Sequence, residues 1–219
     1  MKKETKKSLS VSISFLAAFL LWTLLVRMID RQAIGPLGSV VGFAKFNGYV
    51  HELFDVHMFL YDLTDLLSII PLAIVFGFGA LGLVQWIKRK KLFSIDRDII
   101  ALGLFYLAVF AVFIAFEILV INYRPVLIEG VLEASYPSST TMLAMCVLPT
   151  AAMQFKARIQ NKALKECVFY LTVAFTVFMV LARLISGVHW ITDIIGGALL
   201  SAGLVLLFDF FCGLKKNEI

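Results

Sequence analysis

The chain has 219 residues, of which 61% are hydrophobic and only 16% are charged, and its mean hydropathy is +0.93. Soluble domains have about 45–50% apolar and about 25% charged residues, so this composition excludes a water-soluble globule, a disordered chain, collagen and a coiled coil. The apolar residues come in long runs and do not alternate with polar ones, which argues against an outer-membrane barrel. The sequence therefore predicts an all-α integral membrane protein whose single domain covers residues 1–219. No basic stripe interleaved with aromatic residues is present, so a nucleic-acid partner is not expected.

Six stretches are apolar enough to cross about 30 Å of hydrocarbon as helices, which takes roughly 20 residues each. The first follows a Lys-rich start like that of a signal peptide, but no small-residue cleavage site follows it, so we interpret it as a retained helix. The fourth is short and is expected to begin within the preceding loop. The prediction is a six-helix bundle with spans at about residues 11–28, 66–87, 99–121, 141–155, 167–185 and 191–212.

The 20 Lys and Arg residues are divided unequally between the connecting segments. Most lie in the two tails and in the loops after the second and fourth spans. Because such residues are retained in cytoplasmic loops, both termini are predicted to be cytoplasmic, in a multi-pass protein of the cell membrane. Segments 29–65, 122–140 and 186–190 are then expected to face outside.

The first of these outer segments, 29–65, is long and semi-apolar. Its apolar residues between Val40 and Met58 lie near helical spacing, which predicts interfacial helices on the bilayer surface between spans one and two. They could form a lid or a lateral gate, although simple interfacial packing is the favoured interpretation. In the last span, small residues should let another helix approach closely, namely Gly196, Gly197, Ser201 and Gly203.

Five ionisable residues gather at the predicted outer ends of three spans. Charged groups near hydrocarbon are costly, so their shared level indicates a functional site, with a structural ion-pair network as the alternative. His189 and Asp193 are four residues apart and share a helix face, so the carboxylate can accept a proton from one imidazole nitrogen and leave the other free as a nucleophile. The remaining members of the group are Glu117, Arg124 and Arg183.

Two further features are suited to binding an anion. Arg124 and Arg183 can grip phosphate oxygens through bidentate hydrogen bonds. Segment 136–140, Tyr-Pro-Ser-Ser-Thr, precedes the fourth span, where its hydroxyls and backbone N–H groups could form an anion site at a helix N-terminus. The same string taken alone is a turn with an N-cap.

The spacing of these residues resembles that of the type-2 phosphatidic acid phosphatases, the membrane branch of the superfamily that includes vanadium haloperoxidases, and in particular its bacterial integral-membrane members. The third motif of that family is an Arg, five residues, a His, three residues and an Asp. Arg183, His189 and Asp193 keep this spacing in full, while Ala182 stands where the family usually has Ser. The order and outward siting of the three family motifs also match.

The other two motifs match in part. The first is a Lys, six residues and Arg-Pro; Arg124 and Pro125 match it, but Glu117 takes the place of the Lys. The second is Pro-Ser-Gly-His, which corresponds here to segment 137–140, and Thr140 stands where the family has its His.

The resemblance implies hydrolysis of a phosphate ester through a phosphohistidine. His189 would attack phosphorus and Asp193 would orient it. No metal or organic cofactor is implied, and the implied partners are a lipid phosphate and the bilayer. The groups implied to bind the equatorial phosphate oxygens are Arg124, Arg183, Ser138, Ser139 and nearby backbone N–H groups.

The missing His of the second motif bears on the substrate. In the family it gives a proton to the leaving alkoxide, and such general acid catalysis is worth about 10²–10⁴-fold. Thr140 is no comparable acid, whereas a phosphate leaving group is far less basic than an alkoxide and needs little help. The substitution therefore favours a polyprenyl or other lipid diphosphate over a lipid monophosphate.

Glu117 has three possible roles that the sequence leaves open. It could pair with Arg124 or Arg183, it could be protonated and replace the missing acid because burial raises a carboxyl pKa, or it could meet a cationic head group.

The favoured function is an integral-membrane lipid phosphatase or diphosphatase that acts outside. The alternatives are a head-group phosphotransferase or phospholipase C-like enzyme, and a degenerate, non-catalytic member that binds lipid phosphate. Retention of both arginines with the His–Asp pair argues against degeneration.

Overall fold

The computed structural model describes residues 2–91 and 94–215, and these ranges are almost entirely helical. Within them, β-structure is limited to three isolated bridges, two of which lie in the loop between residues 120 and 138. The helices in chain order are α1 (Lys2–Met28), the 3-10 turn η1 (Pro36–Gly38), α2 (Ala44–Phe54), α3 (Met58–Leu67), α4 (Ile69–Arg89), α5 (Arg97–Leu119), α6 (Ser139–Arg158), α7 (Lys162–Ile185) and α8 (Ile191–Lys215).

The prediction of an all-α membrane bundle is confirmed. Among the described residues, five helical segments are long and apolar enough to cross a bilayer: α1, α3 with α4, α5, α7 and α8. Their outer faces expose many large apolar side chains, including Leu20, Phe76, Leu107, Ile118 and Leu171. Such surfaces are expected where the solvent is lipid, and the chain is a multi-pass membrane protein.

Helix α6 is the sixth long helix and occupies the middle of the bundle. It packs against α4, α5, α7 and α8, and half of its 20 residues are buried. At 1.5 Å per residue it is about 30 Å long, enough to cross the hydrocarbon. Because its neighbours are helices and not lipid, it can carry polar side chains such as Thr150 and Gln154, and its low hydropathy follows from this central place.

Small residues on α8 allow the close packing that the sequence predicted. A Cβ at Gly203 would lie 2.7 Å from Leu16 of α1, and a Cβ at Gly196 would lie 2.6 Å from the ring of Tyr136. The Ser12 hydroxyl on α1 also donates a 2.8 Å hydrogen bond to the Gly203 carbonyl. These contacts fix α8, which carries part of the candidate site, against α1 and the segment just before α6.

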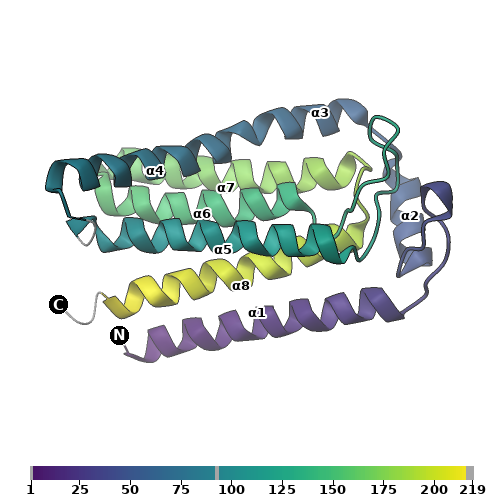
Figure 1. Cartoon of the computed structure of the whole chain (residues 1–219), viewed down its shortest axis with the longest axis horizontal. Helices are drawn as coiled ribbons and strands as arrows, with labels where there is room; N and C mark the ends of the chain where they lie inside the picture. Colours follow the sequence, from purple (N-terminus) through teal and green to yellow (C-terminus); the bar gives the residue numbers. More distant parts are fainter. Residues whose placement is uncertain (1, 92–93, 216–219) are drawn as a thin grey trace.

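The segment between α1 and α4 agrees with the prediction in one part and differs in another. Helix α2 lies across one end of the bundle, as an interfacial helix should (Figure 1). Helix α3 does not lie on the surface but runs on toward α4, interrupted only at Ser68. The second span therefore starts at Met58 and not at residue 66. Pro71 lies in the first turn of α4, where its missing N–H is tolerated, so it starts a helix without ending the span.

The two ends of the bundle differ in charge. The N-terminal end of α1 and the C-terminal end of α8 lie at the end opposite α2 (Figure 1). The basic ends of α4 and α6 share that end, while α2, loop 120–138 and the α7–α8 turn share the other, which we call the site end. The unequal charge distribution thus corresponds to the two ends of one bundle, and the side of the membrane that each end faces stays a prediction.

Candidate active site

The structure brings together four of the ionisable residues that the sequence predicted. They come from three segments that meet at the site end: the loop after α5, the end of α7, and the turn into α8. All four are deeply buried, with exposed fractions of 7% for Arg124, 1% for Arg183, 3% for His189 and 0% for Asp193. Burying four ionisable groups costs free energy unless each one makes compensating contacts with polar or charged partners.

A small hairpin-like loop positions Arg124. The Arg124 N–H donates to the Glu133 carbonyl at 3.0 Å, and the Ser135 N–H donates to the Asn122 carbonyl at 2.9 Å. The tip of this loop is Glu129–Gly130, where both residues have positive φ, 50° and 79°. Two successive residues with positive φ form a two-residue hairpin turn, the shortest common connection between antiparallel segments. Glycine at the second position adopts positive φ without the steric clash that a Cβ would cause. The loop therefore folds back on itself and turns Arg124 toward the bundle.

The Asp193 carboxylate is held by groups from two segments. One oxygen accepts the Trp190 backbone N–H at 3.0 Å, and the other accepts the Asn122 side-chain N–H at 3.3 Å. His189 Nδ1 lies 3.7 Å from the first of these oxygens. This distance is too long for a hydrogen bond but short enough for the carboxylate to stabilise positive charge on the ring.

The other ring nitrogen of His189 faces Arg124. Its Nε2 lies 3.2 Å from Arg124 Nη1. A guanidinium only donates, so this contact requires Nε2 to be the unprotonated acceptor and leaves the ring proton on Nδ1, toward Asp193. Burial lowers the pKa of His189 well below its usual 6.5, and the charges of Arg124 and Arg183 lower it further. The ring is therefore neutral at pH 7, with a free lone pair on Nε2.

Tyr61 of α3 connects the two arginines. Arg183 Nη1 donates to the Thr64 hydroxyl at 3.0 Å, and its Cζ lies 4.6 Å from the centre of the Tyr61 ring. The Cζ of Arg124 lies 5.9 Å from the same ring. An aromatic face attracts cations, so it offsets part of the repulsion between two guanidiniums and helps keep them close.

Segment 136–140 divides its side chains between different surroundings. Ser138 is buried and caps α6, since its hydroxyl accepts the Thr141 N–H at 3.4 Å, which confirms the N-cap prediction. The Ser138 N–H donates to the Asp193 carbonyl at 3.1 Å and so joins the second motif to the third. Ser139 lines both a small polar cavity and an adjoining apolar groove, and Thr140 lines the groove.

The small polar cavity has a volume of about 530 Å³, and one of its lining residues is Glu117, which replaces the Lys of the family's first motif. Glu117, at the exposed end of α5, lines it together with Arg124, Glu133 and Ser139. The carboxylate nearest Arg124 is that of Glu133, with 2.9 Å between Nε and Oε2. Within the described ranges, no ion pair joins Glu117 to Arg124 or to Arg183.

Three residues of this arrangement were not predicted from the sequence: Asn122, Glu133 and Tyr61. Asn122 gave a detectable signal, because it is a lone amide two residues before Arg124 in an otherwise apolar stretch. It is 1% exposed, and its side-chain oxygen also accepts the Gly42 N–H at 3.3 Å. Glu133 and Tyr61 gave no such signal, since their roles depend on how an irregular loop and the α3–α4 span approach the site.

Comparison with known proteins identifies the family of the chain. The family model of the PAP2 superfamily matches residues 72–211, which include both arginines, His189 and Asp193. No curated protein sequence matches the chain. A similar solved structure is that of a transmembrane PAP2-type phosphatidylglycerolphosphate phosphatase from Bacillus subtilis, with 19% identity, a TM-score of 0.63 and coverage of 94% of this chain and 96% of that one. At 19% identity, the structural similarity shows a common fold only. The family match is the stronger finding, because it covers more than half of the chain. The chain belongs to the PAP2 superfamily.

Proposed function

We propose that the protein is a lipid phosphatase or diphosphatase that works through a phosphohistidine on His189. The observation that carries the proposal is the position of His189 Nε2, unprotonated and 3.2 Å from an Arg124 guanidinium. A nucleophile beside a bidentate phosphate-binding group is what phosphoryl transfer needs, since catalysis of that reaction consists mainly of positioning and electrostatic stabilisation. Family membership supports the same class of reaction.

In the first step the phosphoryl group enters between Nε2 and the arginines. The Nε2 lone pair forms a bond to phosphorus while the bond from phosphorus to the leaving oxygen breaks, and that oxygen takes the electron pair. The ring then carries positive charge, which Asp193 stabilises from 3.7 Å. In the second step the oxygen of a water molecule attacks phosphorus, the P–N bond breaks, and its electrons return to Nε2. Phosphate leaves, and the proton lost by water goes to phosphate or solvent.

The leaving group distinguishes the two classes of substrate. Thr140 occupies the position of the family's acid His, and its hydroxyl is too weak an acid to donate a proton to the leaving oxygen as the P–O bond breaks. A diphosphate substrate avoids the problem because its leaving group is a weakly basic phosphate. We therefore favour a lipid diphosphate, such as a polyprenyl diphosphate, over a lipid monophosphate.

We also propose that the site end faces outside the cell membrane, because the N-terminal end of α1, the C-terminal end of α8 and the basic ends of α4 and α6 lie at the opposite end. Glu129, at the exposed tip of the loop, offers a labelling position for a cysteine variant. In a background without the native cysteines, a membrane-impermeant thiol reagent should label Glu129→Cys in intact cells. Labelling only after permeabilisation would reverse the orientation.

The activity itself is tested with a panel of lipid monophosphates and diphosphates offered to the purified protein. Release of inorganic phosphate, faster from diphosphates and abolished by His189→Ala, is the expected result. Saturable binding of these lipids with no release of phosphate would instead support the non-catalytic alternative.

A further inference from the structure

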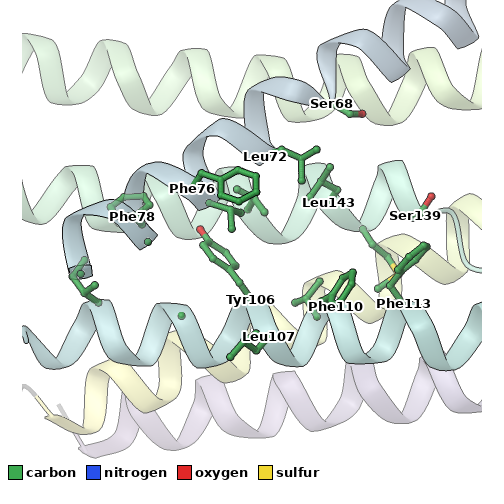
Figure 2. A pocket seen from close by; sticks show the side chains of 18 of the residues that line it. Ser68, Leu72, Phe76, Phe78, Tyr106, Leu107, Phe110, Phe113, Ser139 and Leu143 are labelled. Carbon is green, nitrogen blue, oxygen red and sulfur yellow. The ribbon is translucent and has the colours of Figure 1, made fainter. Parts of the chain in front are cut away.

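An apolar groove runs along one side of the bundle, between α4 and α5, with α6 as its floor (Figure 2). Its volume is about 780 Å³. Large apolar side chains make up most of its wall, and those of Phe76, Leu107 and Phe110 are exposed, so the groove opens sideways to the surroundings of the bundle. The hydroxyl of Tyr106, which also lines it, is paired with that of Thr150 at 3.1 Å and presents no free polar group.

The groove begins beside the candidate active site. Phe113 and Ser139 line both the groove and the small cavity that contains Arg124 and Glu133. Figure 2 shows these two residues at one end of the groove, with Phe78 near the other. Polar lining residues also gather near the α6 N-terminus, where Thr140 follows Ser139.

The groove has the length expected for a hydrocarbon chain. From Phe113 to Ile99 is fourteen residues of α5, about 21 Å at 1.5 Å per residue, within a hydrocarbon layer of about 30 Å. A molecule whose polar end lies in the small cavity would therefore have its apolar part inside the groove, at the depth of the lipid tails. An apolar wall next to a phosphate site is suited to an amphiphile and not to a free phosphate.

Two glycines widen the deep part of the groove. Gly79 on α4 and Gly103 on α5 both line it, and a Cβ added at either would meet no other atom within 4 Å. Farther on, the groove narrows, because a Cβ at Gly82 would lie 3.2 Å from Ile99. Larger side chains at Gly79 or Gly103 would thus occupy groove space without displacing the packing of the bundle.

We propose that this groove binds one hydrocarbon chain of the lipid substrate, and that Gly79 and Gly103 determine how long that chain can be. The inference rests on the proposed function, because the groove is assigned as the tail site for a head group held at Arg124 and His189. It adds a specificity determinant that lies on α4 and α5, away from the phosphate site.

The test compares Gly79→Leu and Gly103→Leu with Gly77→Leu as the matched control. Gly77 lies on the same helix as Gly79, its Cβ position is equally free of neighbours, and it does not line the groove. The substrates are a short-chain and a long-chain lipid with the same phosphate head group. For the two groove variants, kcat/KM should fall by about tenfold or more with the long chain and stay near the wild-type value with the short chain. Gly103→Ala should give a smaller loss, and Gly77→Leu should change neither.

Equal losses for both chain lengths, or no loss for either, would overturn the proposal. Hydrolysis of the short-chain lipid by the wild-type protein reports separately on the proposed function. A second measurement does not depend on turnover: a long-chain lipid phosphate with a photoreactive group at the end of its tail is cross-linked to the His189→Ala protein. Labelling should fall on groove residues of α4 or α5 and decrease with Gly103→Leu. Labelling only on lipid-facing residues outside the groove would contradict the assignment.

Discussion

Arg124 Nη1 lies 3.2 Å from His189 Nε2, so a guanidinium directly faces the nitrogen that we propose as the nucleophile. The contact has two consequences. It fixes the ring proton on Nδ1, and it marks the place where phosphate oxygens would replace the ring as partners of the guanidinium. The two proposed partners of the phosphoryl group are thus next to each other before substrate arrives.

The first prediction concerns the arginines. Arg124→Lys and Arg183→Lys keep the charge but lose the planar fork that binds two oxygens at once. Each should lower kcat/KM by about 10²–10³, the usual cost of removing one donor that stabilises the transition state. Arg158→Lys is the control, because Arg158 pairs with Asp98 at the opposite end of the bundle. An Arg124→Lys protein with wild-type kcat/KM would remove Arg124 from the proposed phosphate site.

The second prediction concerns Asn122 as a positioning residue. Its side chain donates to Asp193 and accepts from the Gly42 N–H, so it ties the carboxylate to the connection between α1 and α2. Asn122→Ala should lower kcat by about tenfold, the value of one hydrogen bond to a charged group, with little change in KM. Asn122→Asp should be worse, because it places a second carboxylate against Asp193.

Asn161→Ala provides the control for Asn122, since Asn161 is also an asparagine that makes a local hydrogen bond but lies at the far end, capping α7. A loss of thermal stability in Asn122→Ala with unchanged kcat would assign Asn122 a purely structural role.

The third prediction follows from the lowered pKa of His189. Between its usual 6.5 and the lower folded-state value, the unfolded chain binds a proton that the folded protein does not. The free energy of unfolding should therefore fall as the pH is lowered below about 6.5, approaching about 1.4 kcal/mol per pH unit from this group. Thermal unfolding of wild type and His189→Gln, measured across this range, isolates the effect: the wild type should lose more stability than the variant. Parallel losses in both proteins would mean that His189 is not buried in its neutral form.

The fourth prediction concerns the departures from the family motifs. Thr140→His should raise kcat/KM for a lipid monophosphate more than for a diphosphate, because only the alkoxide needs a proton. Glu117 lines the polar cavity with Arg124, so Glu117→Gln tests whether it replaces that acid. A selective loss of monophosphate hydrolysis would identify Glu117 as the acid, and equal effects on both substrates would exclude this role. Efficient hydrolysis of a monophosphate by a wild type that ignores diphosphates would contradict the leaving-group argument.

Much of this arrangement could be predicted from the sequence because it depends on local spacing. The four-residue separation of His189 and Asp193 does bring the two side chains together, but they do not share a helix face as predicted, because His189 lies in the turn before α8 and only Asp193 lies on the helix. The ends of α5 and α7 at the site end bring Arg124 and Arg183 to the same level. The start of the second span was misplaced because the semi-apolar residues after Met58 resemble an interfacial helix as much as the beginning of a span. Whether such a helix lies on the surface or continues inward depends on its packing against α7, which is a tertiary contact.

The partners of the predicted residues were harder to predict for the same reason. Glu133 reaches Arg124 only because loop 120–138 folds back at Glu129–Gly130, and Tyr61 reaches both arginines only because α3 extends the second span. The apolar groove could not be predicted at all, since most of its lining comes from α4, α5 and α6, and no sequence period specifies how far apart these helices lie.

Direct detection of the covalent intermediate tests the central claim. The purified protein is mixed with a lipid substrate carrying a radiolabelled terminal phosphate, quenched rapidly in alkali, and digested for peptide mapping. We predict a base-stable, acid-labile label on His189 that forms and decays at rates consistent with turnover, and that is absent from His189→Ala. Steady release of phosphate without any labelled histidine, or with the label on another residue, would contradict the proposed mechanism.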